Sequence, residues 1–319
     1  MTNIMRAAVI DAFGPADTLR LTDLPVPVPG EGEVLIRVHA AGINAIDWAS
    51  RAGQGVGVSA FPAVLGWDLS GTVVTGTGVT GPQAGDEVFG MPRFPALAGA
   101  YAEYVVSPAD EVVPKPDNVD HRTAAAAPMV GITAWQTLFR HAGLERGQRV
   151  LVHGAAGGVG HVAVQLAAGT GAEVVGTASA RNHDFVAGLG ASRVVDYTAE
   201  RVEDVVRDID VVVDTRGGDD AVRLLDVLRP GGILVTLKGQ DDKLDATARE
   251  RGLRTGYTYV SPDAEALVDI ARRLADGSLR IALEQAFPLE RVAAAHATGE
   301  EGHVRGRLVL DVYSASGGN

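Results

Sequence analysis

The chain has 319 residues, of which 46% are hydrophobic and 21% charged, values typical of folded globular domains and unlike those of disordered chains. Its 40 acidic and 28 basic side chains give a formal net charge of -12, which argues against nucleic acid or an anionic membrane surface as partner. There is no cysteine, which excludes disulfides, thiolate catalysis and zinc sites built from cysteine. The length indicates about two domains.

No apolar run in the sequence reaches the length of a membrane span. The first residues lead into an expected strand without the pattern of a secretory signal peptide. We therefore expect no membrane partner and a cytoplasmic location.

Residues 5–123 have the pattern of a β-rich domain. Short β-prone runs alternate with turn clusters, such as the Pro- and Gly-rich residues 25–32. The expected strands lie within residues 6–13, 18–24, 33–43, 70–76, 86–91 and 101–108.

From about residue 124 the pattern changes. Residues 124–128 and 131–141 are expected to be helical, and strands then alternate with helices. The expected strands are residues 149–154, 172–178, 192–197, 210–215 and 232–237, and the helices between them include 161–169, 181–189 and 221–228. Such alternation predicts βαβ units, hence a mostly parallel sheet with helices on both faces.

The last part of the chain, after a helix expected at residues 263–276, returns to the composition of the first domain in residues 278–289 and 306–312. The sequence therefore predicts an α/β fold in which a doubly wound parallel sheet is inserted in a β-rich domain. We place the β-rich domain at residues 1–124 plus 264–319 and the inserted domain at residues 125–263.

A glycine-rich turn at residues 154–160 follows the first strand of the alternating region. It reads Ala155-x-Gly157-x-x-Gly160, the dinucleotide fingerprint with alanine at its first position. Such glycines let the backbone approach a pyrophosphate, which the N-terminus of the following helix attracts. The pattern alone is equally typical of an ordinary glycine-rich turn, so its context decides.

The end of the second expected strand bears on the choice of dinucleotide. NAD-binding folds place Asp or Glu there to bond the ribose 2′-hydroxyl. Here the strand is followed by Ser179, Ala180, Arg181 and Asn182. A hydroxyl and a guanidinium suit a 2′-phosphate, although Arg181 could also be a solvated residue at a helix start. We predict NADPH as the cofactor.

Nine short motifs follow one another along the chain in a specific order. They lie at residues 40–53 (AAGINAIDWASRAG), 61–73 (FPAVLGWDLSGTV), 85–90 (GDEVFG), 99–106 (GAYAEYVV), 124–138 (AAAAPMVGITAWQTL), 155–160 (AAGGVG), 189–197 (LGASRVVDY), 228–235 (LRPGGILV) and 303–310 (HVRGRLVL). In this order they resemble the zinc-free quinone oxidoreductase and enoyl reductase (ζ-crystallin-like) branch of the medium-chain dehydrogenase/reductase superfamily.

The resemblance implies a GroES-like substrate domain split around a Rossmann domain, NADPH as hydride donor and a homodimer. It places Ala156, Gly157, Gly158 and Val159 at the pyrophosphate, Ser179 and Arg181 at the 2′-phosphate and Tyr197 beside the adenine ribose. It places Thr133 and Asn44 near the nicotinamide. The implied substrate is a small apolar carbonyl compound or a quinone.

The chain departs from zinc-dependent relatives, which carry a cysteine and a histidine where this sequence has Asn44 or its neighbours and Trp67. We therefore expect no metal. Bacterial quinone reductases often have a tyrosine where this chain has Trp48, Ala49 and Ser50. Quinone specificity consequently does not carry over from the resemblance alone.

Reduction without a metal depends on positioning the nicotinamide and on a hydrogen-bond donor at the substrate's carbonyl oxygen. Asn44 is our candidate donor, and a cap of the following helix is its equally weighted alternative. Asp47 and Asp68 are expected to bond backbone amides or a nearby arginine rather than to act as acids. Trp48, Trp67, Phe94 and Tyr257 are candidate pocket residues, although core packing explains such side chains almost as well.

The sequence thus predicts an NADPH-dependent enzyme that reduces a quinone or an activated C=C bond without zinc. One alternative is a redox-neutral biosynthetic enzyme, such as a cyclase, on the same scaffold. Another is a non-catalytic nucleotide-binding protein. The non-catalytic alternative is disfavoured because the chain has an intact glycine turn together with Ser179 and Arg181.

Overall fold

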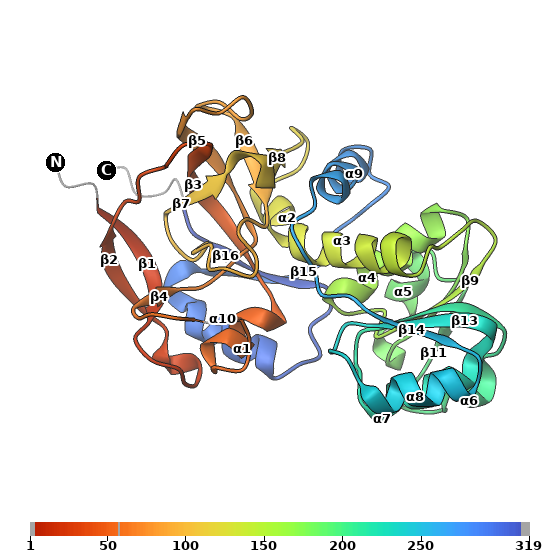
Figure 1. The fold of residues 1–319 in the computed structure, drawn as a ribbon. Coiled ribbons are helices and arrows are strands. Elements are labelled where there is room, and N and C mark those ends of the chain that lie inside the picture. Colours follow the sequence, from red (N-terminus) through yellow and green to blue (C-terminus); the bar gives the residue numbers. More distant parts are fainter. Residues whose placement is uncertain (1–3, 57, 314–319) are drawn as a thin grey trace. The chain divides into compact units, whose positions relative to one another are not determined.

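The computed structural model describes residues 4–56 and 58–313, which form two compact units (Figure 1). Unit 1 holds the described residues up to Met129, then Ser261–Gly277 and the residues from Ile281 onward. Unit 2 holds Val130–Val260 and Ser278–Arg280. The predicted α/β fold is confirmed: a doubly wound parallel sheet is inserted in a β-rich unit.

Unit 1 is built on a mainly antiparallel sheet in the order β15-β16-β3-β5-β6-β8, and β7 also pairs with β3. Its strands are β3 (Glu33–Ile43), β5 (Leu69–Thr77), β6 (Glu87–Gly90), β7 (Tyr104–Pro108), β8 (Val112–Pro114), β15 (Leu283–Pro288) and β16 (Arg307–Asp311). The last strand, β16, pairs antiparallel with β3, so the C-terminal segment completes the sheet begun near the N-terminus.

A smaller antiparallel sheet of unit 1 has the order β2-β1-β4. It consists of β1 (Ile4–Ile10), β2 (Arg20–Pro25) and β4 (Ala63–Val64). The helices and 3₁₀ turns of unit 1 are η1 (Ala16–Thr18), α1 (Ala45–Arg51), η2 (Ala109–Glu111), α2 (His121–Ala126), α9 (Ala264–Ala275), η6 (Leu289–Arg291) and α10 (Val292–Glu300). Helix α3 (Pro128–Trp135) begins in unit 1 and continues in unit 2.

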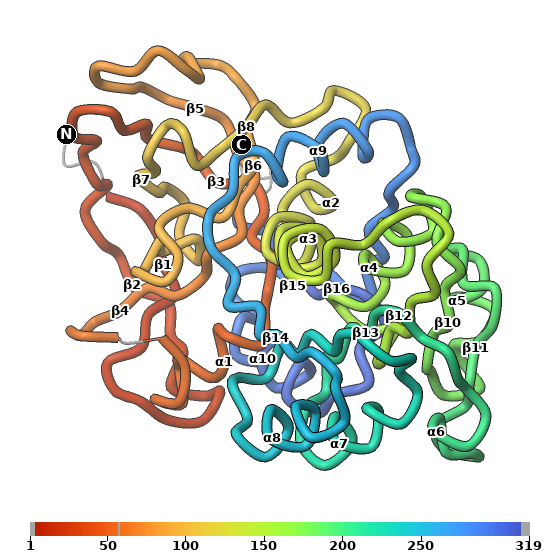
Figure 2. Tube along the Cα trace, turned by 45° about the vertical axis from the view of Figure 1, so that its right-hand side comes forward, coloured from red at the N-terminus to blue at the C-terminus, as the bar shows by residue number. Residues whose placement is uncertain are grey.

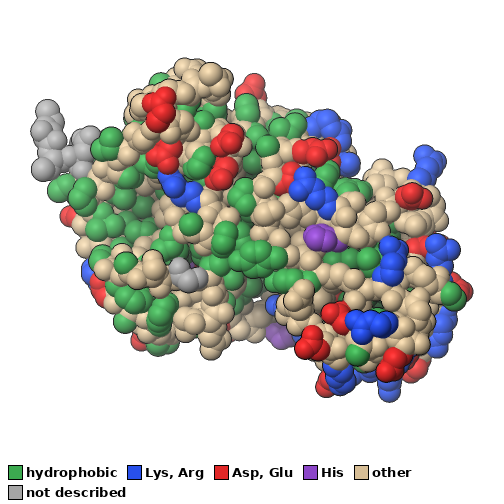
Figure 3. Space-filling view, viewed as in Figure 1, with side chains coloured by type: hydrophobic (Ala, Val, Ile, Leu, Met, Phe, Trp, Pro, Cys, Tyr) green, Lys and Arg blue, Asp and Glu red, His purple; other side chains and the backbone are tan. Residues whose placement is uncertain are grey.

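The core of unit 1 forms because apolar side chains of its strands and helices share one interior. Val34, Ile36 and Val38 alternate along β3, as one face of a half-buried strand requires. They pack with Leu308 and Leu310 of β16 and with apolar residues of α10. Hydrophobic side chains that remain on the surface include Phe13, Val28, Phe61 and Val74, and Figure 3 shows such side chains over this unit.

Unit 2 contains a parallel sheet in the order β11-β10-β9-β12-β13-β14. Figure 2 labels β10 to β14 along the Cα trace of this unit. Its strands are β9 (Arg149–His153), β10 (Glu173–Thr177), β11 (Arg193–Val195), β12 (Ile209–Asp214), β13 (Leu228–Thr236) and β14 (Arg254–Tyr257). The chain runs outward from β9 to β11 and then returns to β12 on the other side of β9. This reversal is the switch point at which doubly wound sheets bind ligands.

The helical segments of unit 2 are η3 (Gln136–His141, a π-helix), α4 (Gly158–Gly169), η4 (Ala180–Asn182), α5 (His183–Gly188), α6 (Val202–Val205), α7 (Asp219–Leu224), η5 (Leu225–Val227) and α8 (Asp242–Glu250). Leu151, Val175, Val212 and Leu234 form a core with α6, α7 and α8 on one face of the sheet. Helix α4 packs against β9 and β10. Because helices cover such a sheet, its strands read as continuous apolar runs, and every residue of β12 is buried.

Candidate functional site

The glycine turn of unit 2 connects β9 to α4. Gly154 has a φ of 84°, a conformation that favours glycine, and its carbonyl accepts the N–H of Gly157 at 3.1 Å. A Cβ on Gly160 would lie 2.1 Å from the Gly154 carbonyl oxygen. The first turn of α4 can therefore approach the end of β9 only if residue 160 is glycine.

The start of α4 differs from those of α8 and α9. Asp241 and Asp263 cap those helices through their carboxylates, whereas the N-cap of α4 is Gly157, which has no side chain. The first N–H groups of a helix lack intrahelical partners, and the helix dipole adds positive potential there. At residues 156–159 the start of α4 therefore has the backbone chemistry that suits a phosphate group.

The carboxyl end of β10 leads into η4, whose N-cap is Ser179 in an extended conformation. Ser179 is half-buried, and Arg181 is exposed two residues later. Tyr197 follows β11, the strand next to β10, and is 44% exposed. A hydroxyl, a guanidinium and an aromatic ring therefore follow two adjacent strands at the same edge of the sheet.

Thr133 lies on α3 and is buried. Its carbonyl accepts the hydroxyl of Thr137 at 2.7 Å, and the hydroxyls of Thr137 and Thr258 are 3.0 Å apart. Thr137 belongs to η3, which continues α3, and Thr258 directly follows the edge strand β14, so these contacts join this helical segment to the edge of the sheet. All the residues that we predict to contact the cofactor, apart from Asn44, belong to unit 2.

Asn44 belongs to a buried polar cluster in unit 1. It is the N-cap of α1, and its N–H donates to Asp47 Oδ2 at 2.6 Å. Its side-chain Nδ2 donates to Asp68 Oδ2 at 3.0 Å. The amide therefore fixes the entry into α1 and links that helix to the residue before β5.

Asp68 is fully buried and uses both carboxylate oxygens. Oδ1 accepts the N–H of Met129 at 2.8 Å, and Oδ2 accepts Arg307 Nη2 at 3.0 Å. Burial raises the pKa of Asp68 to about 6, while the charge of Arg307 opposes that rise. Burial raises the pKa of Asp47 to about 7. Both aspartates thus bond backbone amides, and Asp68 also bonds an arginine.

A second set of buried polar contacts adjoins this cluster. His296 Nε2 lies 3.2 Å from the hydroxyl of Tyr101, and its Nδ1 lies 3.2 Å from Arg51 Nη1. Arg51 also donates to Glu300 at 2.5 Å. Burial, followed by the charge of Arg51, lowers the pKa of His296 to about 3, so the imidazole is neutral at pH 7.

The candidate pocket residues fall into separate groups. Trp67 is fully buried and donates from its indole N–H to the Ala96 carbonyl at 2.7 Å. Its ring packs edge-on against Phe94, with ring centroids 5.5 Å apart. Trp48 instead faces α10, where a Cβ on Gly299 would lie 2.5 Å from its ring. Tyr257 is in unit 2, 6.3 Å from Tyr259 between ring centroids. The structure thus brings Trp67 and Phe94 together.

Residues 4–56 and 58–313 contain no group of three or more His, Asp or Glu side chains arranged to hold a metal ion. At position 67, where zinc-dependent relatives have a histidine, the side chain is the packed indole of Trp67. In the same described part of the chain, no helix has the length and apolar character needed to cross a membrane.

Arg307, Tyr101 and His296 are polar residues that we did not single out from the sequence as parts of a site. Tyr101 and Arg307 lie within the motifs at residues 99–106 and 303–310, but their polar partners are distant along the chain, as is Arg51 from His296. Their residue type gives little signal in the sequence, because the need of a residue such as Arg307 for a partner follows from its burial, and arginine is almost never fully buried unless it is paired.

Two family models match separate ranges of the chain. The model described as alcohol dehydrogenase GroES-like domain matches residues 30–117, and the one described as zinc-binding dehydrogenase matches residues 189–310. Over the whole chain, the NAD(P)H oxidoreductase RTN4IP1, mitochondrial, of Danio rerio is 34% identical and covers 97% of this chain and 92% of its own. The 2-methylene-furan-3-one reductase of Solanum lycopersicum is 33% identical, over 96% of this chain and 79% of its own.

Solved structures agree. The quinone oxidoreductase from Coxiella burnetii superposes with a TM-score of 0.92 at 34% identity, covering 97% of this chain and 100% of its own. The Escherichia coli quinone oxidoreductase complexed with NADPH has a TM-score of 0.86 at 26% identity, over 96% and 100% of the two chains.

The fold and the glycine turn define an oxidoreductase that uses a nicotinamide cofactor and a small-molecule substrate. The chain belongs to the medium-chain dehydrogenase/reductase superfamily, in its zinc-free quinone oxidoreductase branch.

The cytoplasmic location that we expected is wrong. The relatives from Danio rerio, Mus musculus and Homo sapiens are all named as mitochondrial, as is the probable zinc-binding oxidoreductase of Arthroderma benhamiae. The expectation failed because net charge, apolar content and the lack of a secretory pattern do not distinguish one aqueous compartment from another.

Proposed function

We propose that this chain is an NADPH-dependent oxidoreductase that delivers a hydride, without zinc, to a quinone or to the activated C=C bond of an α,β-unsaturated carbonyl compound. One observation carries the proposal. The start of α4 has no capping side chain, and the neighbouring strand β10 is followed by Ser179 and Arg181 instead of an acid. The first feature suits a pyrophosphate, and the second suits a 2′-phosphate rather than a free 2′-hydroxyl.

In this proposal Ala156, Gly157, Gly158 and Val159 hold the pyrophosphate through backbone N–H groups. Ser179 and Arg181 bind the 2′-phosphate, while Tyr197 covers the adenine ribose and Thr133 lies near the nicotinamide. Bound there, NADPH supplies the hydride. Arg181 makes charge-assisted hydrogen bonds, which are about twice as strong as neutral ones.

The descriptions of two similar proteins support the proposal. The Escherichia coli quinone oxidoreductase was solved with NADPH, which supports the phosphorylated cofactor. The tomato relative is a 2-methylene-furan-3-one reductase, a name that supports reduction of a C=C bond conjugated to a carbonyl group.

For the substrate we propose Trp48, Trp67, Phe94 and Tyr257 as apolar contacts and Asn44 as the donor to a carbonyl oxygen. The Asn44 amide has two N–H bonds and gives one to Asp68, so the other remains for a substrate. Asp68, held by Arg307, fixes the orientation of the amide. We also propose a homodimer, as the family resemblance implies, which sedimentation equilibrium would measure.

The test is an assay of the purified chain with NADPH or NADH and a panel of quinones and enones, followed by absorbance of the reduced nicotinamide. We expect substrate-dependent oxidation that is faster with NADPH at low cofactor concentration. Binding of NADPH without oxidation by any member of the panel would contradict the proposed reaction while leaving the cofactor site intact. A lack of binding by either dinucleotide would contradict the whole proposal.

A further inference from the structure

Arg216 follows β12 at the carboxyl edge of the unit 2 sheet. Strand β12 pairs in parallel with β9, with Asp214 opposite His153, so the segments after both strands leave the sheet at the same edge. Ligands of open α/β sheets bind outside this edge. Arg216 therefore lies on the segment next to the glycine turn.

A buried carboxylate fixes the backbone at this position. Asp214 is fully buried, and its Oδ1 accepts the N–H groups of Arg216 at 2.9 Å and Gly217 at 3.1 Å. Its Oδ2 accepts the hydroxyl of Thr236 on β13 at 3.1 Å. These hydrogen bonds fix the main chain of Arg216, so its side chain leaves the backbone at a defined position at the edge of the sheet.

The side chain of Arg216 packs along the start of the glycine turn. An ideal Cβ built on Gly154 would lie 3.6 Å from Cδ and 3.7 Å from Cγ of Arg216, which is ordinary contact distance. The carbonyl of the same glycine accepts the N–H of Gly157, the N-cap of α4. Arg216 also interacts electrostatically with His153. Burial is the main cause that lowers the pKa of this imidazole. The charge of Asp214 opposes the decrease, and the charge of Arg216 adds to it.

The guanidinium of Arg216 has no hydrogen-bond or ion-pair partner within residues 4–56 and 58–313. The acidic residues that follow it are already paired, Asp219 with Lys243 and Asp220 with Arg223. The chain as a whole has 12 more acidic than basic side chains. An exposed arginine without a carboxylate partner, seated against a phosphate-binding turn, is therefore well placed for an anionic ligand.

We infer that Arg216 is a second anion-binding residue of the dinucleotide site and donates to the pyrophosphate bridge. The inference rests on the proposed function and adds a residue to it. Arg181, after β10, is assigned the 2′-phosphate that only NADPH carries, whereas Arg216, beside the turn after β9, contacts phosphates that NADPH and NADH share. The two arginines consequently differ in which cofactors they affect.

The test is calorimetric titration of the wild type and of Arg216→Gln with NADPH and, separately, with NADH. Glutamine keeps part of the stem that packs on Gly154 and removes the charge. We expect both dissociation constants to rise by about tenfold and in the same proportion, and Arg216→Lys to recover part of the loss. The affinity of the wild type should also fall more steeply with salt than that of Arg216→Gln.

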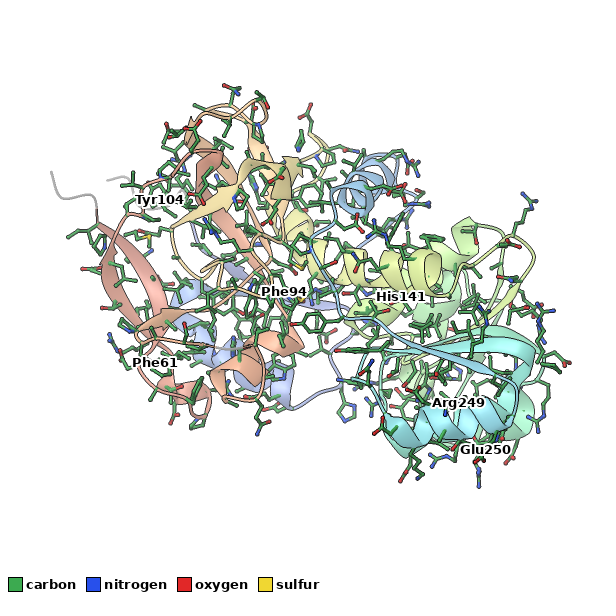
Figure 4. The ribbon with its side chains drawn as sticks, in the orientation of Figure 1. Phe61, Phe94, Tyr104, His141, Arg249 and Glu250 are labelled. Atoms are coloured by element: carbon green, nitrogen blue, oxygen red, sulfur yellow. The ribbon has the colours of Figure 1, made fainter. Side chains whose placement is uncertain are left out.

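The matched control is Arg249→Ala, which removes one exposed positive charge from α8 of the same unit (Figure 4). We expect it to leave both dissociation constants unchanged. Thermal unfolding monitors the fold of each variant, and Arg216→Ala provides a second charge-free variant if glutamine perturbs the turn.

Unchanged affinity for both dinucleotides in Arg216→Gln would overturn the inference and leave the proposed function standing. A loss confined to NADPH would also overturn it, because the contact would then be with the 2′-phosphate. If the wild type bound neither dinucleotide, the proposed function itself would fail.

Discussion

Asp68, directly before β5, and Arg307, the first residue of β16, form an ion pair in the interior of unit 1. Arg307 Nη2 lies 3.0 Å from Asp68 Oδ2, and the side chains are 5% and 0% exposed. Arg307 Nε also donates to the Ala126 carbonyl at 2.9 Å. The pair ties the C-terminal strand to the segment that positions Asn44.

The first prediction concerns this pair. Removing one partner leaves an uncompensated buried charge, which costs about 3 kcal/mol or more, whereas replacing both can cost much less. We expect Arg307→Met to lower the free energy of unfolding by about 3 kcal/mol. Adding Asp68→Asn should restore part of that loss. Urea unfolding of the two single variants and the double variant would measure these free energies of unfolding. Strictly additive losses would contradict the energetic coupling between Arg307 and Asp68.

The second prediction concerns the glycine turn. Alanine at position 160 would place its Cβ against the Gly154 carbonyl, so we expect a loss of about 2 kcal/mol or more in stability and weakened dinucleotide binding. Gly188 is the matched control, since a Cβ there meets nothing within 4 Å. Thermal unfolding should show a change of less than about 1 kcal/mol for Gly188→Ala. Equal behaviour of the two variants would contradict the close approach at Gly160.

The third prediction concerns acid stability. His39 and His121 stack with ring centroids 4.1 Å apart, and burial, followed by the charge of His121, lowers the pKa of His39 to about 4. The nearby charges of Arg37 and Lys115 lower it further, and Glu87 opposes them. The unfolded chain, with a histidine pKa near 6.5, therefore binds more protons than the native state between about pH 6.5 and 4. Stability conferred by neutral His39 is full above pH 6.5 and is lost as the pH falls toward 4.

His39→Phe keeps an aromatic ring against His121 and removes this titration. We expect the decrease in unfolding free energy between pH 7.5 and pH 5 to be smaller by about 1 kcal/mol, a value reduced for the partial exposure of the ring. Substitution of the exposed His141 by glutamine serves as the control and should leave the decrease as it is in the wild type. Identical pH dependence in wild type and His39→Phe would show that His39 does not contribute.

The sequence predicts a structural feature well when the residues that form it are close together along the chain. The period-two and helical patterns predict the strands and most helices, because these depend on neighbouring residues. Local detail is less accurate. The helix expected at residues 131–141 is α-helical only to Trp135 and continues as a π-helix, and α4 begins at Gly158, before the expected 161–169.

The candidate site shows the same limit. The contact between Asn44 and Asp47 spans three residues and has the spacing of a helix-capping pair, so it is readable from the sequence. The Asp68–Arg307 pair spans 239 residues, and the contact between Arg51 and His296 spans 245. No local pattern specifies such partners, since they meet only after the strands that carry them have assembled.

The fourth prediction concerns metal removal. The chain has no cysteine, and a packed tryptophan, Trp67, stands where zinc-dependent relatives have a histidine. Dialysis against a strong chelator, followed by gel filtration, should leave the rate of NADPH oxidation within experimental error of the untreated enzyme. Loss of activity that added zinc restores would be incompatible with this prediction.

The central claim is that the carboxyl end of β10 selects the phosphorylated dinucleotide through Ser179 and Arg181. Its most direct test is the ratio of dissociation constants for NADH and NADPH in the wild type and in Arg181→Ala. We predict that the wild type binds NADPH at least about tenfold more tightly and that the variant loses most of this preference while its affinity for NADH stays nearly constant. Equal affinity of the wild type for the two dinucleotides, or an equal loss for both in the variant, would contradict it.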